Sequence, residues 1–98
     1  MLIRIVRMTF RPEALGTFMT IFEGSKASIR AFPGCQHLEL LGDLDNPNVR
    51  LTYSYWESAE ALDAYRQSEL FRTTWAATKV LFADKPIAFS VERLEVVK

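Results

Sequence analysis

One alternating segment, residues 49–56, restricts the possible folds more than any other feature of the chain. Its sequence, VRLTYSYW, puts apolar or aromatic side chains at every second position, from Val49 to Tyr55, and ends with Trp56 on the other side. Large apolar groups on both sides of a strand indicate a sheet that is covered on both faces. A chain of 98 residues with two short helices can cover only one face, so the other must be buried elsewhere.

Three more segments carry strand patterns. They are residues 2–10, residues 35–41 and the stretch after Pro86, where Phe89 and Val91 alternate with polar neighbours. The turn-forming run GDLDNPN at residues 42–48 predicts a chain reversal between the second and third strands.

Two segments carry helical periodicity. One helix is predicted from Pro12 to about Phe32, where a Pro-Gly pair ends it. Another begins after Ser58, a good N-cap, and its apolar spacing shifts near Ser68, which predicts a kink. The order β-α-β-β-α-β predicts an α+β, ferredoxin-like fold, with a four-stranded antiparallel sheet and helices on one face, as a single domain over residues 1–98.

The aromatic content suggests what covers the remaining face. Seven Phe, three Tyr and two Trp are a large apolar load for a core of this size, so we expect part of it against a second subunit or around a ligand. The sheet face carrying Val49, Leu51, Tyr53 and Tyr55 is expected to pack on a second copy, which predicts a homodimer.

Charge and composition argue against several classes of partner. Twelve basic residues balance twelve acidic ones, so no basic field for nucleic acid is expected. No apolar run of about 20 residues and no leader pattern is present, and Cys35 is the only cysteine. We therefore expect no membrane partner and a cytoplasmic location.

Motifs for metal and nucleophilic chemistry are missing, so no metal site and no cofactor is expected. Cys35, His37 and Glu39 are expected on one strand face, but alternate residues lie roughly 6.5–7 Å apart, too far for a nucleophile and its base. The favoured interpretation is a buried cysteine beside a partly exposed histidine. His37 remains the candidate base because only its side chain ordinarily titrates near neutral pH.

Two tryptophans and an arginine have both structural and functional interpretations. Trp56 shares its strand face with Thr52 and Ser54, which would leave room for a flat ligand, or it packs on the second helix. Trp75 follows Phe71 by four residues, and core packing is the default for this pair. Arg50 either points a charge at an anionic substrate or lies in solvent at the strand end.

Several stretches together resemble the antibiotic biosynthesis monooxygenase family. They are FPGC at residues 32–35, YSYWESAEAL at residues 53–62, SELF at residues 68–71, and Trp75. The Trp-Glu-Ser junction followed by Ser-x-x-Phe is the most specific part, and the likeness covers nearly the whole chain. The resemblance implies a homodimer with a ferredoxin-like core, a dimeric α/β-barrel, and a pocket between sheet and helices in each subunit.

The resemblance also implies site residues. Trp56 would face the substrate ring and Thr52 would present a polar group to it, with Tyr65, Phe71 and Trp75 as further substrate-binding residues. The residues implied to stabilise a phenolate or peroxy anion are Arg50, Tyr65 and Arg72. Haem-degrading relatives place a histidine where this chain has Trp75 and an asparagine where it has Val6, so haem oxygenation is not expected.

Three functions follow as expectations. The first is a cofactor-independent monooxygenase that oxidises a small aromatic quinol or phenol, with His37, Arg50 and Arg72 as catalytic candidates. The second is a dimeric binding or stress-associated module that holds a hydrophobic molecule without transforming it. The third is an isomerase, because the family includes one and a single fold hosts several chemistries.

Overall fold

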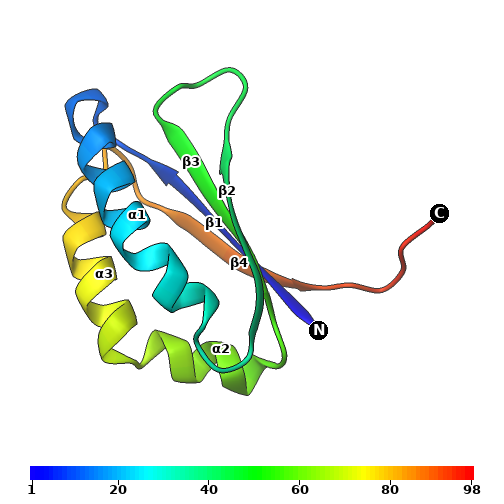
Figure 1. The fold of residues 1–98 in the computed structure, drawn as a ribbon. Coiled ribbons are helices and arrows are strands. Elements are labelled where there is room, and N and C mark those ends of the chain that lie inside the picture. Colours follow the sequence, from blue (N-terminus) through cyan, green and yellow to red (C-terminus); the bar gives the residue numbers. More distant parts are fainter.

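A four-stranded antiparallel sheet with every helix on one of its faces forms the structure, a computed structural model that describes residues 1–98 (Figure 1). The elements, in chain order, are β1 (Leu2–Thr9), a 3-10 turn (Pro12–Ala14), α1 (Leu15–Arg30), β2 (Cys35–Gly42), β3 (Val49–Trp56), α2 (Ala59–Arg66), α3 (Glu69–Lys79) and β4 (Ile87–Glu92).

The strand order confirms the predicted ferredoxin-like α+β topology. It is β2-β3-β1-β4, and each neighbouring pair is antiparallel. The first and third strands therefore lie in the centre, and the alternating pattern of residues 49–56 belongs to one of the central strands. None of the helices is long and apolar enough to cross a bilayer.

The second predicted helix is two helices rather than one kinked helix. Ser58 and Ser68 each cap a new helix, and their hydroxyl oxygens accept the N–H groups of Ala61 and Phe71, both at 3.1 Å. The shift in apolar spacing near Ser68 marks this break. Because α2 and α3 have separate axes, α2 lies near the end of β3 whereas α3 runs beside α1 in the helical layer (Figure 1).

A β-bulge in β2 overturns one expectation from the sequence. Cys35 pairs with Trp56 whereas His37 pairs with Tyr55, so one extra residue stands between the two pairs. The extra residue reverses the alternation, and Cys35 and His37 lie on opposite faces of the sheet. Their predicted placement on one face is wrong, because simple period-two counting fails across a bulge.

The apolar core on the helical side is divided. Met8, Phe10 and Phe18 form one buried cluster, and the other is formed by Cys35, Trp56 and Leu62. Only 13 of the 98 residues are buried, which leaves neither cluster large enough to fill the whole layer between sheet and helices. The space between the clusters is where the candidate site lies.

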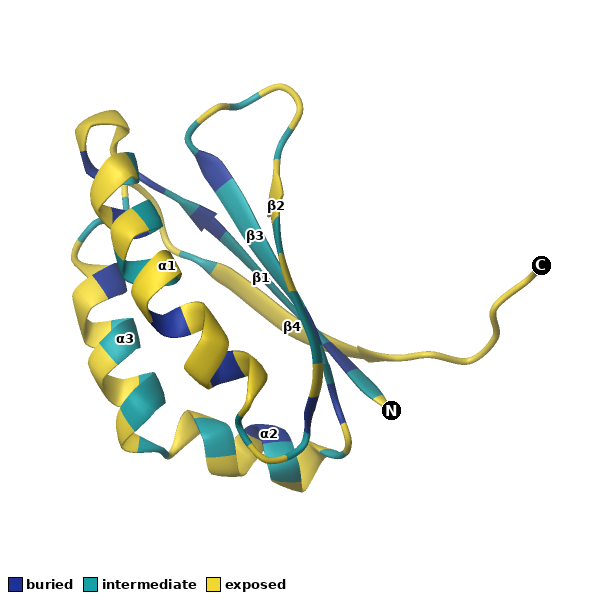
Figure 2. Cartoon of the chain, in the orientation of Figure 1, coloured by how far each residue is buried: buried dark blue, intermediate teal, exposed yellow.

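The opposite face of the sheet has no covering element. Ladder partners place the following residues on it: Ile3, Ile5, Arg7, His37, Glu39, Leu41, Leu51, Tyr53, Tyr55, Ile87, Phe89 and Val91. We call this set the open face. Val49, the ladder partner of Thr9, lies on this side as expected but is fully buried. All of β4 is exposed (Figure 2), and the strand predicted after Pro86 ends at Glu92.

Gly34 provides a test of how α2 is joined to the sheet. Its φ is +89°, and a Cβ atom there would lie 2.5 Å from the Cβ of Ala61. Gly34→Ala should therefore lower the free energy of unfolding by about 2–4 kcal/mol, through the unfavourable backbone and the clash. Urea denaturation at fixed protein concentration measures this change.

The matched control is Gly24→Ala in α1, where an added Cβ has no atom within 4 Å. That substitution should raise the free energy of unfolding by about 0.5–1 kcal/mol, because alanine favours a helix interior. Equal effects of the two substitutions would contradict the close approach of Gly34 to α2.

Candidate functional site

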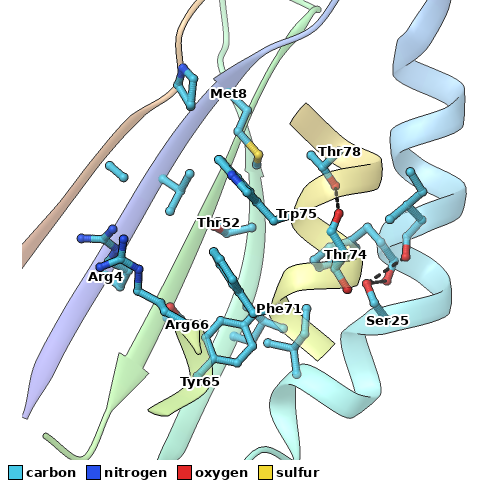
Figure 3. A pocket seen from close by; sticks show the side chains of 18 of the residues that line it. Arg4, Met8, Ser25, Thr52, Tyr65, Arg66, Phe71, Thr74, Trp75 and Thr78 are labelled. Carbon is cyan, nitrogen blue, oxygen red and sulfur yellow. Dashed lines mark hydrogen bonds between the residues drawn. The ribbon is translucent and has the colours of Figure 1, made fainter. Parts of the chain in front are cut away.

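A cavity of about 250 Å³ lies between the sheet and the helices (Figure 3). Its walls come from all four strands on one side and from α1, α2 and α3 on the other, and most of the lining side chains are apolar. Met8 and Phe18 of one core cluster and Trp56 and Leu62 of the other all reach it. The cavity therefore occupies the gap in the divided core.

An unbroken series of aromatic rings forms part of the wall. Trp56 stacks on Tyr65 with ring centres 4.9 Å apart, and Tyr65 meets the edge of Phe71 at 5.2 Å. Phe71 then stacks on Trp75 at 5.8 Å with the planes only 12° apart. We call these four residues the aromatic wall. It offers π faces and ring edges to a flat ligand.

Trp56 belongs both to the core and to the cavity. Only 1% of it is exposed, and its indole Nε1 donates a hydrogen bond to Ser54 Oγ at 3.0 Å. The hydroxyl two residues earlier on the same strand thus satisfies the only polar atom of the ring. The two interpretations that the sequence left open for Trp56 are compatible, since the same ring packs against α2 and lines the cavity.

The structure brings together all five residues predicted to bind substrate. Thr52, Trp56, Tyr65, Phe71 and Trp75 line the one cavity, and they come from β3, α2 and α3. Substrate binding by these residues stays a prediction.

The three residues predicted to be catalytic do not line the cavity. His37 lies on the open face, where its ring packs against Tyr55 at 4.6 Å. Arg50 folds back on its own strand end, and its Nη1 donates to the backbone carbonyls of residues 47 and 49. Arg72 is exposed on α3. The structure places none of the three beside another, and their catalytic role stays a prediction without support from geometry.

Two arginines that the sequence reasoning passed over do line the cavity. Arg4 comes from the inner face of β1 and Arg66 from the last turn of α2 (Figure 3). Burial and the nearby charge of Arg66 lower the pKa of Arg4. The sequence did carry a signal for Arg4. Arg4, Val6 and Met8 are spaced two residues apart, which places the arginine on the same strand face as two apolar residues, the face expected to pack on the core.

No Asp, Glu, His, Cys or Lys side chain lines the cavity. Its titratable lining residues are Arg4, Tyr65 and Arg66. Burial, and to a smaller extent the Cys35 thiol, raise the pKa of Tyr65 to about 12. Tyr65 therefore keeps its proton and can donate a hydrogen bond but cannot serve as a base. The chain also has no group of three or more side chains placed to hold a metal ion.

Because the pKa of Tyr65 is raised in the folded protein, the stability of the fold should change with pH in the alkaline range. A folded pKa of about 12 against the usual 10.0 means that the unfolded chain loses this proton first. The contribution of Tyr65 to the free energy of unfolding should be fully present below pH 10 and should decrease as the pH rises from 10 to about 12. Tyr65→Phe should reduce this fall, measured by urea denaturation across the alkaline range. Identical alkaline profiles for the two proteins would contradict the burial of the hydroxyl.

Comparison with known proteins identifies related sequences and folds. A family model described as antibiotic biosynthesis monooxygenase matches residues 1–77. No curated protein matches the chain.

Solved structures of the same fold cover almost the whole chain. An antibiotic biosynthesis monooxygenase superposes with a TM-score of 0.90 and 19% identity, over 97% of this chain and 100% of that one. A protein from Mycobacterium tuberculosis gives 0.89 and 21%, over 99% and 98%. A conserved protein from Methanosarcina mazei Go1 gives 0.89 and 18%, over 95% and 93%. At these identities the structural likeness establishes the fold alone.

Proposed function

The chain belongs to the antibiotic biosynthesis monooxygenase family, and on that premise we propose that it oxidises a small aromatic phenol or quinol with molecular oxygen, without a bound cofactor. The observation that carries the proposal is the aromatic wall inside a mostly apolar cavity. A volume of about 250 Å³ lies just below the usual range for ligand pockets, which favours a compact, flat substrate.

In the proposed reaction the electrons come from the substrate. The keto tautomer of such a phenol, as in an anthrone, carries an activated ring CH₂ group. Reaction of this group with O₂ gives a ring C=O group and one molecule of water, so the substrate carbon supplies all four electrons that reduce oxygen. The ionised phenol is the electron-rich form that reacts with oxygen. The protein has to hold the ring, stabilise its anion and keep bulk water away from reactive intermediates.

The lining residues suit those tasks. The aromatic wall would orient the ring by stacking and edge contacts. Thr52 and the protonated hydroxyl of Tyr65 are hydrogen-bond donors for a substrate oxygen. Apolar side chains from α1, among them Phe18 and Ile29, separate the cavity from solvent on the helical side.

A second candidate function is a binding module that holds an aromatic molecule without converting it. The observation that favours it is the lack of a general base among the lining residues. The two functions differ in oxygen consumption, since both need ligand binding but only the first consumes O₂.

We also propose that the functional unit is a homodimer formed by the open face. Nine of its twelve residues are apolar or tyrosine, and Phe89 is 45% exposed in the single chain. An apolar surface of this kind across a whole sheet is typical of an interface. A second copy related by a two-fold axis would supply a complementary sheet face and leave the cavity, on the opposite side, accessible.

Oxygen uptake tests the proposed oxidation. Purified, metal-free protein should consume O₂ above the spontaneous rate with at least one member of a panel of hydroquinones, naphthols and anthrones. Trp75→Ala should lower that rate about ten-fold or more, because it removes a ring of the aromatic wall without touching the fully buried Trp56.

Lys79→Gln on the outside of α3 is the control and should retain the rate. Saturable quenching of tryptophan fluorescence by panel compounds, with no oxygen uptake from any of them, would refute the oxidation and support the binding module. Loss of uptake in His37→Gln, Arg50→Gln or Arg72→Gln would support the catalytic role predicted for that residue.

Light scattering tests the homodimer. The protein should have about twice the 11.2 kDa mass of one chain. Phe89→Glu should shift the mass towards one chain, because a carboxylate in an apolar interface would lose its hydration. Leu44→Glu, at a fully exposed loop position, should leave the mass unchanged. A single-chain mass for the unaltered protein would remove the proposal.

A further inference from the structure

We propose that Arg4 and Arg66 form an anion-binding pair at the cavity, so that the ligand is an aromatic anion whose ring lies on the aromatic wall and whose charged oxygen meets the two guanidinium groups. The inference rests on the proposed function for the fate of the ligand and deepens it by naming the substrate class. Phenolates and ring carboxylates share this chemistry.

The two arginines reach the same cavity from different elements. Arg4 stands on the inner face of β1, opposite Ser54 in the central ladder. Arg66 is in the last turn of α2, directly after Tyr65 of the aromatic wall. Figure 3 shows both side chains at one end of the cavity, and their proximity is also evident in the lowered pKa of Arg4.

Neither arginine has an acidic partner. The ion pairs of the chain are Arg11–Glu13 and Lys26–Glu23, and His37 forms a third with Glu39 only when it is protonated. Arg4 donates one hydrogen bond, to the neutral hydroxyl of Ser90 at 3.1 Å, and Arg66 makes no side-chain hydrogen bond.

The nearest acidic residue along α2 is already engaged elsewhere. The Asp63 carboxylate accepts a hydrogen bond from the Gln67 side chain at 2.8 Å, and it forms no ion pair with Arg66. Two guanidinium groups that repel each other, one of them partly buried, lower the stability of the fold unless an anion lies between them. A planar oxyanion matches the N–H donors of arginine in both charge and geometry.

The position of the pair beside the aromatic wall specifies the rest of the ligand. Tyr65 and Arg66 are consecutive, and Ser54, the ladder partner of Arg4, holds the indole of Trp56. A charged substituent on a ring that stacks on the aromatic wall would therefore lie close to the two arginines. A ligand with separate apolar and anionic parts fits this layout.

The same pair compensates for the missing base. Tyr65, the only other titratable lining residue, stays protonated, so no side chain in the cavity can take a proton from a bound phenol near neutral pH. Nearby positive charge lowers the pKa of an acidic ligand, by about 1–3 units in typical cases. The arginines would then favour the phenolate itself, with its proton released to water.

A chromophoric phenol measures this effect without turnover. The probe is 4-nitrophenol, whose phenolate absorbs visible light, titrated with pH in the presence of saturating metal-free protein. The pKa of the bound probe should fall by about one unit or more below that of the free probe. Arg66→Gln should remove most of the shift, Arg66→Lys should retain part of it, and Lys79→Gln should retain all of it. An unshifted pKa in the unaltered protein refutes phenolates as the anion that the pair binds.

A matched ligand pair extends the test to carboxylates. Quenching of tryptophan fluorescence gives affinities for 2-naphthoate and for neutral 2-naphthamide, which have the same ring. The unaltered protein should bind the naphthoate at least about ten-fold more tightly, and Arg66→Gln should abolish the preference. A pKa shift for nitrophenol without a naphthoate preference assigns the pair to phenolates, and equal affinities with no pKa shift overturn the inference.

These readouts separate the inference from the proposed function. An anion preference that depends on Arg66, in a protein that consumes no oxygen with any panel compound, upholds the anion-binding pair and refutes the oxidation. Oxygen uptake that is unchanged in both Arg66→Gln and Arg4→Gln refutes the anion-binding pair and leaves the oxidation standing. Circular dichroism confirms folding of each variant, and Arg66, which is exposed, is the safer of the two to replace.

Discussion

The packing of Trp56 is the interaction on which the remaining structure depends. Its ring ends β3, contacts Cys35 and Leu62, stacks on Tyr65 and is fixed by a hydrogen bond from Nε1 to Ser54. These contacts join the sheet to α2 at one end of the molecule. Removing a ring this deeply buried would cost about 3–5 kcal/mol, a large part of the stability of a small domain.

The cavity follows from how little core the chain can build. One buried cluster packs α1 against the sheet where β1 ends, and Trp56 packs α2 against the opposite end of the sheet, where β3 ends. Between them the helices stand away from β1 and β3, and the aromatic wall borders the space without filling it. A closely packed interior would exclude a ligand, so the division of the core is what makes binding possible.

The positive charge of this apolar cavity is concentrated at one end. Arg4 and Arg66 have no acidic partner and lie at one end, while the aromatic rings extend from there along α2 and α3. No titratable base accompanies them. The chemistry that the cavity can support is therefore electrostatic, through stabilisation of an anion, and any proton has to leave through water. The open face of the sheet, turned away from the cavity, can be covered without obstructing it.

The sequence by itself determined the element order and the apolar side chains on both faces of residues 49–56. Through the family resemblance it also named five residues that line one cavity, whose role in ligand binding stays a prediction. Period-two alternation, helical spacing and serine caps are local properties, so they can be read from the chain. Only the tertiary structure decided that His37 faces away from Cys35, because a single bulge reverses the alternation, and that Arg4 and Arg66 lie at the same end of the cavity. Both depend on the placement of segments far apart in sequence, which local periodicity does not encode.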